Sequence, residues 1–211
     1  MKIPAEKTAV ILIEPQNDFL TEGGTMYAFI KEQLRERGVI GNLQELLAGA
    51  REKGVKIFYV PFHSFAPGFP ELKKGGPAYE GLRGLEIGME ADWGTGAWLR
   101  GTPGPEIIPQ LTPAGGDIVV EGKKTLDAFH STALDYLLRA NEIEYAVFTG
   151  FHTNWCVESS ARSAYDKGYR VIVLGDCTAT DTEREQRYAE EVIFPKIGKV
   201  MDHGAFLDSL V

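Results

Sequence analysis

The chain has 211 residues, of which 44% are hydrophobic and 25% are charged, as in an ordinary globular protein. Its net charge of −8, with no basic cluster beyond Lys73-Lys74 and Lys123-Lys124, argues against a nucleic-acid partner. No apolar run approaches the length of a membrane span and no signal-peptide pattern is present, so we expect no membrane partner and a cytoplasmic protein with two reduced cysteines. Without linker composition or repeats, we expect a single domain over residues 1–211.

A continuous apolar run at residues 8–13, TAVILI, predicts a strand that is covered on both faces. The strand should end at Glu14, because the next residue, Pro15, has no N–H to donate to a sheet. Burying a carboxylate without a partner is costly, so Glu14 either turns outward into solvent or has a partner. Position alone favours the solvated strand end.

Helical spacing of apolar residues then predicts a helix from Ile40 to a C-cap at Gly54. Residues 55–62, VKIFYVPF, predict the second strand, and His63 follows at its carboxyl end. Residues 64–116 are irregular and rich in Gly and Pro. A connection of this length is typical of a lid or binding loop.

The second half of the chain alternates between strand and helix patterns. We expect strands at residues 117–121, 145–149, 169–174 and 199–201, and helices at residues 129–140, 157–167 and 182–192. This alternation predicts a three-layer αβα fold, a Rossmann-like, doubly wound and mostly parallel six-stranded sheet. Ligands bind such sheets at the carboxyl ends of the strands. Four side chains with reactive chemistry follow strands in this way, namely Glu14, His63, Lys123 and Cys156.

Cys156 lies at the junction between a strand and a helix, with Thr153 and Asn154 before it as candidate N-cap residues. The helix start should direct free N–H groups and the positive end of the helix dipole at the thiol, which would lower its pKa. The competing interpretation is a small buried hydrophobe, the commoner role of a lone cysteine. A thiol, a carboxylate and a lysine together favour nucleophilic catalysis at a carbonyl. Spacing alone does not choose between Lys123 and Lys124.

Nearly the whole chain resembles the isochorismatase-like cysteine hydrolases, which include nicotinamidases, N-carbamoylsarcosine amidohydrolase and ureide hydrolases. The most specific segments are residues 13–20 (IEPQNDFL), 123–129 (KKTLDAF) and 150–157 (GFHTNWCV). The resemblance implies the isochorismatase-like hydrolase fold, with Cys156 as nucleophile and Lys123 as the catalytic lysine. Glu14 occupies the third catalytic position, where the family usually has aspartate. Asp18 matches a second acidic position, for which we expect a structural role.

The resemblance further implies a cis peptide bond between Phe151 and His152. That bond would direct the backbone N–H groups of His152 and Cys156 into an oxyanion hole. Nicotinamidases bind a metal through an Asp-x-His pattern after the second strand, where this chain has only His63, so we expect no catalytic metal and no cofactor. The resemblance also implies a small-molecule substrate and a homo-oligomer, either a dimer or a tetramer.

We therefore predict a cysteine-dependent hydrolase that cleaves a C–N bond of a small amide, ureide or carbamoyl compound through a thioester. We expect substrate contacts from Gln16, Phe19, His63 and Trp155, with Trp93 and Trp98 as further candidates for the pocket wall. An ordinary strand-end histidine is an equal interpretation of His63, and internal loop packing is an equal one for the tryptophans.

Two other functions remain open. One is an isochorismatase-type vinyl-ether hydrolase, against which Cys156 argues because isochorismatases proper lack this cysteine. The other is a catalytically silent family member that acts in binding or assembly, which the departure at Glu14 favours. Outside this constellation, we expect Cys177 to be a packing residue and His203 to lie at the surface near the last strand.

Overall fold

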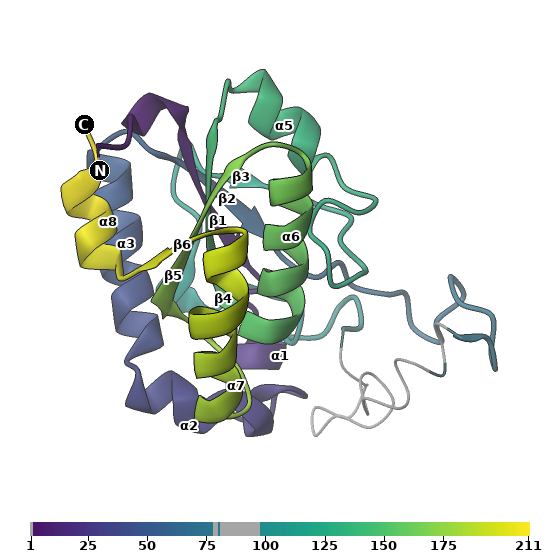
Figure 1. The fold of residues 1–211 in the computed structure, drawn as a ribbon. Coiled ribbons are helices and arrows are strands. Elements are labelled where there is room, and N and C mark those ends of the chain that lie inside the picture. The colour runs from purple at the N-terminus through teal and green to yellow at the C-terminus, as the bar shows by residue number, and fades with distance from the viewer. Residues whose placement is uncertain (1, 78–79, 81–97) are drawn as a thin grey trace.

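The computed structural model describes residues 2–77, 80 and 98–211 (Figure 1). Its centre is a six-stranded sheet in the order β3-β2-β1-β4-β5-β6, in which all neighbouring strands are parallel. The strands are β1 (Thr8–Ile13), β2 (Lys56–Val60), β3 (Ile118–Val119), β4 (Tyr145–Phe151), β5 (Arg170–Ala179) and β6 (Gly198–Met201). The predicted doubly wound α/β sheet is therefore confirmed.

Helices cover both faces of this sheet. The α-helices are α1 (Asn17–Leu20), α2 (Tyr27–Glu36), α3 (Val39–Glu52), α5 (Leu134–Ala140), α6 (Glu158–Asp166), α7 (Glu183–Tyr188) and α8 (His203–Ser209). Short 3-10 turns lie at Ala5–Lys7, Pro109–Leu111 and Phe194–Lys196, and π-helical turns lie at Thr153–Val157 and Ala189–Ile193. Among the described helices, none is both long enough and apolar enough to cross a membrane.

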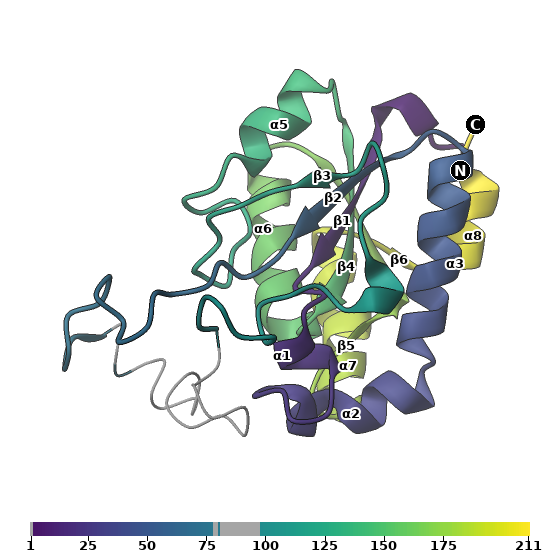
Figure 2. The ribbon, with the colours of Figure 1, turned by 180° about the vertical axis from the view of Figure 1, so that it is seen from behind.

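Two hydrophobic clusters give the fold its three layers. One cluster joins residues of α2, α3 and α8 to one face of the sheet, and the other joins α5 and α6 to the opposite face. Figures 1 and 2 show α3 and α8 side by side on one side of the strands and α5 and α6 on the other. Because β1 and β4 are buried along their whole length, their sequences read as unbroken apolar runs rather than as alternating patterns.

One glycine allows the two central strands to approach closely. Gly150, near the end of β4, has a φ of 106° and pairs with Ile13 of β1. A Cβ at this position would lie 2.0 Å from the carbonyl oxygen of Ile13. Only glycine fits both the backbone angle and the contact.

The element boundaries differ from the sequence prediction in two instructive places. The helix expected from residue 129 begins at Leu134, because Ser131 has a φ of 60° and the Thr132 hydroxyl accepts a hydrogen bond from the Leu134 N–H at 3.1 Å. The strand expected to stop at Leu174 continues as β5 to Ala179, with a shift in its register against β4. Glycine and aspartate within β5 gave the false stop signal.

Candidate active site

Three predicted site residues meet at the carboxyl edge of the sheet. Glu14 follows β1, and Cys156 lies in the turn after β4, the strand that pairs with β1. This is where the strand order reverses, the usual ligand-binding position in open α/β sheets. Lys123 reaches the same place from the segment after β3. Chain connectivity therefore brings three distant segments together at one edge of the sheet.

Glu14 and Lys123 form a fully buried ion pair. The Lys123 ammonium donates hydrogen bonds to Oε1 of Glu14 and, at 2.6 Å, to the carbonyl oxygen of Thr125. Both residues have 0% exposure, so the expectation of a solvated strand end at Glu14 is wrong. Burying an unpaired carboxylate is costly, and the Lys123 ammonium reduces that cost because the two opposite charges compensate each other.

Glu14 reaches this position through an uncommon backbone conformation. Its φ is 54°, in the left-handed region that costs a residue with a side chain about 1–2 kcal/mol. The Glu14 N–H donates to the carbonyl oxygen of Val60 at 3.1 Å, which anchors the turn to the end of β2. The turn aims the carboxylate at Lys123 and Cys156 despite the longer glutamate side chain.

The Cys156 thiol is buried among these charges. It interacts with the Glu14 carboxylate, the Lys123 ammonium and the backbone N–H of His152. Burial first, and the Glu14 charge second, raise the pKa of the Cys156 thiol above its ordinary value, although Lys123 and the His152 N–H act in the opposite direction. The expected lowering of this pKa is therefore wrong, since loss of water outweighs the nearby cation.

The protonation pattern follows from the same contacts. Burial opposes the charge on Lys123, but the coulombic attraction of Glu14 and Cys156 outweighs it and raises the lysine pKa above its ordinary value. The directions of these shifts favour an ammonium at Lys123 and a protonated Cys156. Oε2 of Glu14 has no hydrogen-bond partner among the described residues.

The backbone before Cys156 has two unusual features. The peptide bond between Phe151 and His152 is cis, at the position that the family resemblance implied. The chain then forms the π-helical turn Thr153–Val157, in which the N–H groups of Trp155 and Val157 both donate to the carbonyl oxygen of His152, at 3.2 and 3.1 Å. These two features position the His152 N–H beside the sulfur.

Thr153 and Asn154 do not serve as N-caps, contrary to the sequence prediction. The Thr153 hydroxyl donates to Oε1 of the buried Gln186 at 2.6 Å, and Oδ1 of Asn154 accepts a hydrogen bond from the Thr180 hydroxyl. Their side chains therefore tie the turn to the segments after β5. Sequence spacing gave no signal of these long-range partners.

Ser160 links the cysteine turn to the lysine loop, a connection that the sequence analysis missed. Its hydroxyl donates to the carbonyl oxygen of Cys156 at 2.6 Å and accepts the N–H of Ala128 at 2.9 Å. A serine four residues after a strand-end cysteine is the available signal, because serine commonly bonds back to the i−4 carbonyl of a helix.

Lys124 points away from the Glu14 carboxylate. Its ammonium donates to the carbonyl oxygens of His63 and Ser64, at 3.3 and 3.1 Å, and lies 3.9 Å from the centre of the Phe65 ring. The structure therefore distinguishes between two lysines that spacing could not. His63 is partly buried, and its N–H donates to the carbonyl oxygen of Lys123 at 2.6 Å.

The Gln16 side chain holds two loops together. Its amide nitrogen donates to the carbonyl oxygens of Phe62 and Pro105, at 2.9 and 2.7 Å, and its amide oxygen accepts the Phe62 N–H at 2.7 Å. Both of its N–H groups are thus already used. Gln16 therefore holds these two segments together, and its predicted contact with a substrate stays a prediction.

A row of aromatic rings runs beside the three charged or nucleophilic groups. His152 stacks on Trp155 with centroids 5.5 Å apart, and the edge of Phe19 meets His152 at 5.6 Å. Trp98 lies 4.8 Å from both Phe19 and Phe62, and the Lys123 ammonium lies 5.5 Å from the Phe62 ring. This aromatic row includes two of the predicted substrate contacts, Phe19 and Trp155. Trp93 lies outside the described residues.

The His152 ring is buried without settled hydrogen bonds. It is 1% exposed, and neither ring nitrogen has a hydrogen-bond partner among the described residues. Nδ1 lies 3.0 Å from Oδ1 of Asp181, but the two groups are not aligned for a hydrogen bond. Sequence analysis missed Asp181, although an acidic residue two positions after β5 belongs to the same carboxyl edge.

Asp18 anchors the aromatic row through a hydrogen bond with the backbone of Trp98. Its buried carboxylate accepts hydrogen bonds from the backbone N–H of Trp98 at 3.1 Å and from the Thr25 hydroxyl at 3.4 Å. Burial raises the pKa of Asp18 to about 6, against the opposing hydrogen bonds. Gly104 packs directly on this group, since a Cβ there would lie 2.4 Å from Oδ2 of Asp18. These contacts agree with the structural role expected for Asp18.

Known proteins similar to this chain are hydrolases or members of the isochorismatase family. A family model described as the isochorismatase domain matches residues 8–205. Ureidoacrylate amidohydrolase RutB of Rhizobium rhizogenes is 34% identical over 181 residues, which cover 83% of this chain and 71% of that protein. An isochorismatase family protein of Desulfovibrio vulgaris is 26% identical, with a TM-score of 0.77 over 96% of this chain and 97% of the other. A cysteine hydrolase of Pseudomonas syringae, 24% identical, has the same fold, with a TM-score of 0.81 over 99% of this chain and 94% of the other.

Proposed function

The chain belongs to the isochorismatase family, and from this premise we propose that it is a cysteine-dependent amidohydrolase. It cleaves a C–N bond of a small amide, ureide or carbamoyl compound through a covalent thioester. The observation that carries the proposal is the buried contact of Cys156 with Glu14 and Lys123 at the reversal point of the strand order. The ureidoacrylate amidohydrolases among its relatives support a ureide or related substrate.

The first half of the reaction uses the thiol proton. The Glu14 carboxylate accepts the proton of Cys156 as the sulfur attacks the substrate carbonyl carbon. The N–H groups of His152 and Cys156 stabilise the negative charge that develops on the carbonyl oxygen. Support for this role comes from the contact between the His152 N–H and the sulfur. Glu14 then returns the proton to the leaving nitrogen, and an acyl group remains on Cys156.

The second half of the reaction releases the enzyme. Glu14 accepts a proton from water, which attacks the thioester carbonyl and releases the acid product, and the proton returns to the Cys156 sulfur. Lys123 stays an ammonium throughout and stabilises the negative charge on Glu14 and on the sulfur. A protonated resting thiol suits this order of events, because the base acts only when a carbonyl is present to be attacked.

The aromatic row defines the kind of substrate that fits. Phe19, Trp98 and Trp155 supply flat apolar walls. Nε2 of His152, which has no hydrogen-bond partner among the described residues, supplies a polar group for an amide or ureido function. A small, planar, polar compound satisfies both properties. His63 remains a proposed contact at the other side of Lys123.

Three further features belong to the proposal. The chain forms one domain over residues 1–211, acts in the cytoplasm with reduced thiols, and assembles as a homo-oligomer, either a dimer or a tetramer. Composition supports the first two, and the family resemblance supports the third. Size-exclusion chromatography with light scattering measures the assembly, and a monomer at micromolar concentration would contradict it.

The function is tested with a panel of small primary amides, ureides and carbamoyl amino acids. Ammonia release is measured for the wild-type protein, for Cys156→Ala and for Lys124→Met, whose lysine points away from Glu14. We expect the wild type and Lys124→Met to release ammonia from at least one compound and Cys156→Ala to release none. Equal ammonia release by Cys156→Ala would contradict the covalent mechanism. Hydrolysis confined to a vinyl ether would favour an isochorismatase-type activity instead.

A further inference from the structure

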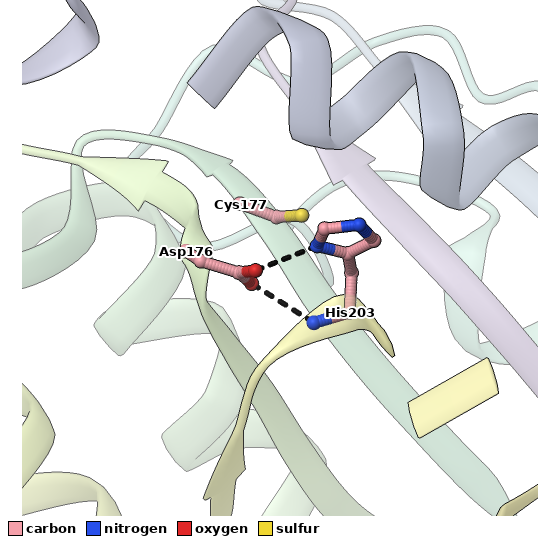
Figure 3. A group of neighbouring side chains, drawn as sticks. All are labelled: Asp176, Cys177 and His203. Atoms are coloured by element: carbon pink, nitrogen blue, oxygen red, sulfur yellow. Dashed lines mark hydrogen bonds and ion pairs between the residues drawn. The ribbon is translucent and has the colours of Figure 1, made fainter. Parts of the chain in front are cut away.

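A second cluster of potential ligands lies at the end of the neighbouring strand. Asp176 and Cys177 occupy the part of β5 where its register against β4 shifts, and His203 is the first residue of α8. Figure 3 shows the three side chains directed toward one another. One ligand atom from each residue lies within 4.8 Å of the others. In the described part of the chain, this is the one such group of three.

The cluster is held by contacts that also orient the histidine. Asp176 accepts the backbone N–H of His203 at 3.0 Å, and its other oxygen lies 2.6 Å from Nδ1 of the ring. On the far side of the ring, Nε2 lies 3.3 Å from Oε2 of Glu45 in α3. The His203 side chain is 16% exposed, so the expectation of a surface residue is wrong. Cys177 is fully buried and belongs to the core cluster that includes residues of α3 and α8.

We propose that Asp176, Cys177 and His203 bind one divalent transition-metal ion of the zinc class. The ligands would be a carboxylate oxygen, the sulfur and Nδ1, and a water molecule would complete a tetrahedral site. Zn²⁺ takes this mixture of oxygen, sulfur and nitrogen ligands, whereas Mg²⁺ and Ca²⁺ take oxygen ligands alone. The ligand atoms are already close, so small side-chain rotations bring them to a common centre.

Glu45 gives the proposal an independent support. A histidine that binds a metal through one ring nitrogen usually donates the other N–H to a carboxylate, which fixes the tautomer and the ring orientation. Glu45 lies at Nε2, whereas Nδ1, the other ring nitrogen, is the one beside Asp176. The arrangement is therefore that of a metal ligand with its outer hydrogen-bond partner.

The proposed metal site is separate from the candidate active site. Cys177 belongs to the core cluster shared with α3 and α8, whereas Cys156 belongs to the cluster on the other face of the sheet. Metal binding forms a sulfur–metal bond, and the Cys177 S–H gives its proton to water. The ion would connect β5 directly to α8 and, through Glu45, to α3. The inferred role is to fasten the C-terminal helix to the sheet.

The test uses the Cys156→Ala protein, in which Cys177 is the remaining thiol. The protein is dialysed against a chelator and titrated with Co²⁺, and the near-ultraviolet thiolate-to-Co²⁺ absorption band is followed. We expect the band to saturate at one equivalent and to disappear when Zn²⁺ is added. Cys177→Ser in the otherwise wild-type chain should lose the band. A band that requires Cys156, or the absence of a saturable band, would overturn the proposal.

Glu45→Gln is a second variant that should leave the fold intact, because the Glu45 side chain is 75% exposed. Replacing the carboxylate beside Nε2 by a neutral amide, a weaker acceptor, should weaken Co²⁺ affinity by about 10- to 100-fold. Glu52→Gln removes a charge from another exposed position of α3 and is the matched control, with affinity unchanged. Equal affinity in Glu45→Gln and Glu52→Gln would contradict the proposed outer partner of His203.

Discussion

Two adjacent strands each lead to a buried cysteine, and the two cysteines have different neighbours. Cys156 follows β4, and Cys177 lies within β5. Burial is the first cause that raises the pKa of both thiols. Beside Cys156 stands the Lys123 ammonium, paired with Glu14, whereas the charges that act on Cys177 are carboxylates, with Asp176 the strongest. Burial alone therefore does not distinguish the two thiols, and the neighbouring charges do.

The backbone reinforces this difference. After β4 the chain turns through a cis bond into a helical segment, which directs an N–H group at the Cys156 sulfur. Around Cys177 the chain continues as a strand to Ala179 and offers no helix start. Among the described residues, a carboxylate, an ammonium and a backbone N–H act together on Cys156, whereas the charges that act on Cys177 are carboxylates. The proposed nucleophilic role needs the first set of neighbours. Cys177 has the surroundings of a ligand.

The largest effect is expected when Cys156, the first of the two cysteines, is replaced. Cys156→Ala should lower kcat/KM by about 10⁴-fold or more, because no other group can form the thioester. Its thermal unfolding should stay close to that of the wild type, since a thiol-to-methyl change removes little packed volume. Steady-state kinetics and a melting curve on the same preparation check both statements. Substantial remaining turnover would show that Cys156 is not the nucleophile.

Removing the cation should make Cys156 resemble Cys177. Lys123→Met leaves Glu14 as an unpaired buried carboxylate beside the thiol, so kcat should fall by about 10³-fold. Lys124→Met, in the next residue, should change kcat by less than about threefold, because its ammonium contacts loop carbonyls instead. Equal losses in the two variants would mean that the ion pair with Glu14 has no special role.

The length of the Glu14 side chain tests how finely the base is positioned. Glu14→Asp restores the usual family residue but withdraws the carboxylate by about one C–C bond from Lys123 and Cys156. A misplacement of about 1 Å can cost about 10²-fold in rate, so kcat should fall by that factor. If Glu14→Asp matched or exceeded the wild type, the left-handed turn at Glu14 would not be tuned to glutamate.

Asp18, which contacts Trp98 of the aromatic row, should make the free energy of unfolding depend on pH. Its pKa is about 6 in the folded chain and near 3.8 when unfolded, so the folded state binds more protons between these values. The free energy of unfolding should therefore fall by about 2–3 kcal/mol as pH rises from 4 to 6. Urea titrations of the wild type and Asp18→Asn measure this fall, which should be absent from the variant.

The smallest effect concerns the resting thiols themselves. Because the pKa of Cys156 is raised, its alkylation by iodoacetamide should be slow at neutral pH and speed up as pH rises. Glu14→Gln removes a negative charge from beside the thiol and should speed alkylation by about tenfold at a given pH, while turnover falls. Peptide mass spectrometry, with chelator present, compares Cys156 with Cys177, which should react more slowly at every pH. Fast alkylation of wild-type Cys156 below neutral pH would contradict this account.

The sequence predicted the strands and the carboxyl edge well because these features depend on local patterns. The apolar runs of β1 and β4 are continuous, and parallel strands must end at a common edge. The sequence missed α2 and α8, whose patterns are short or polar. At α8 the start signal was present, since Asp202 caps the helix by accepting the Ala205 N–H at 2.6 Å.

The charge states could not be predicted from position. Glu14 can be buried because Lys123 compensates its charge. The two residues are 109 positions apart in the sequence, so no local pattern reports their contact. The raised pKa of Cys156 is a sum of burial and opposing charges from three segments, so the helix-start argument captured only one contribution. Gln16 is likewise held by segments far along the chain, and Asp181 approaches His152 across two neighbouring strand ends, contacts that no local pattern reports.

The covalent intermediate provides the most direct test of the central claim. A ureide or amide that releases ammonia in the panel is mixed with the enzyme, quenched in acid within the first turnover, and the protein is digested for mass spectrometry. We expect the acyl mass on the peptide that contains Cys156 and none on the peptide that contains Cys177. Release of a full equivalent of product in the first turnover, with Cys156 unmodified throughout, would contradict thioester catalysis at this cysteine.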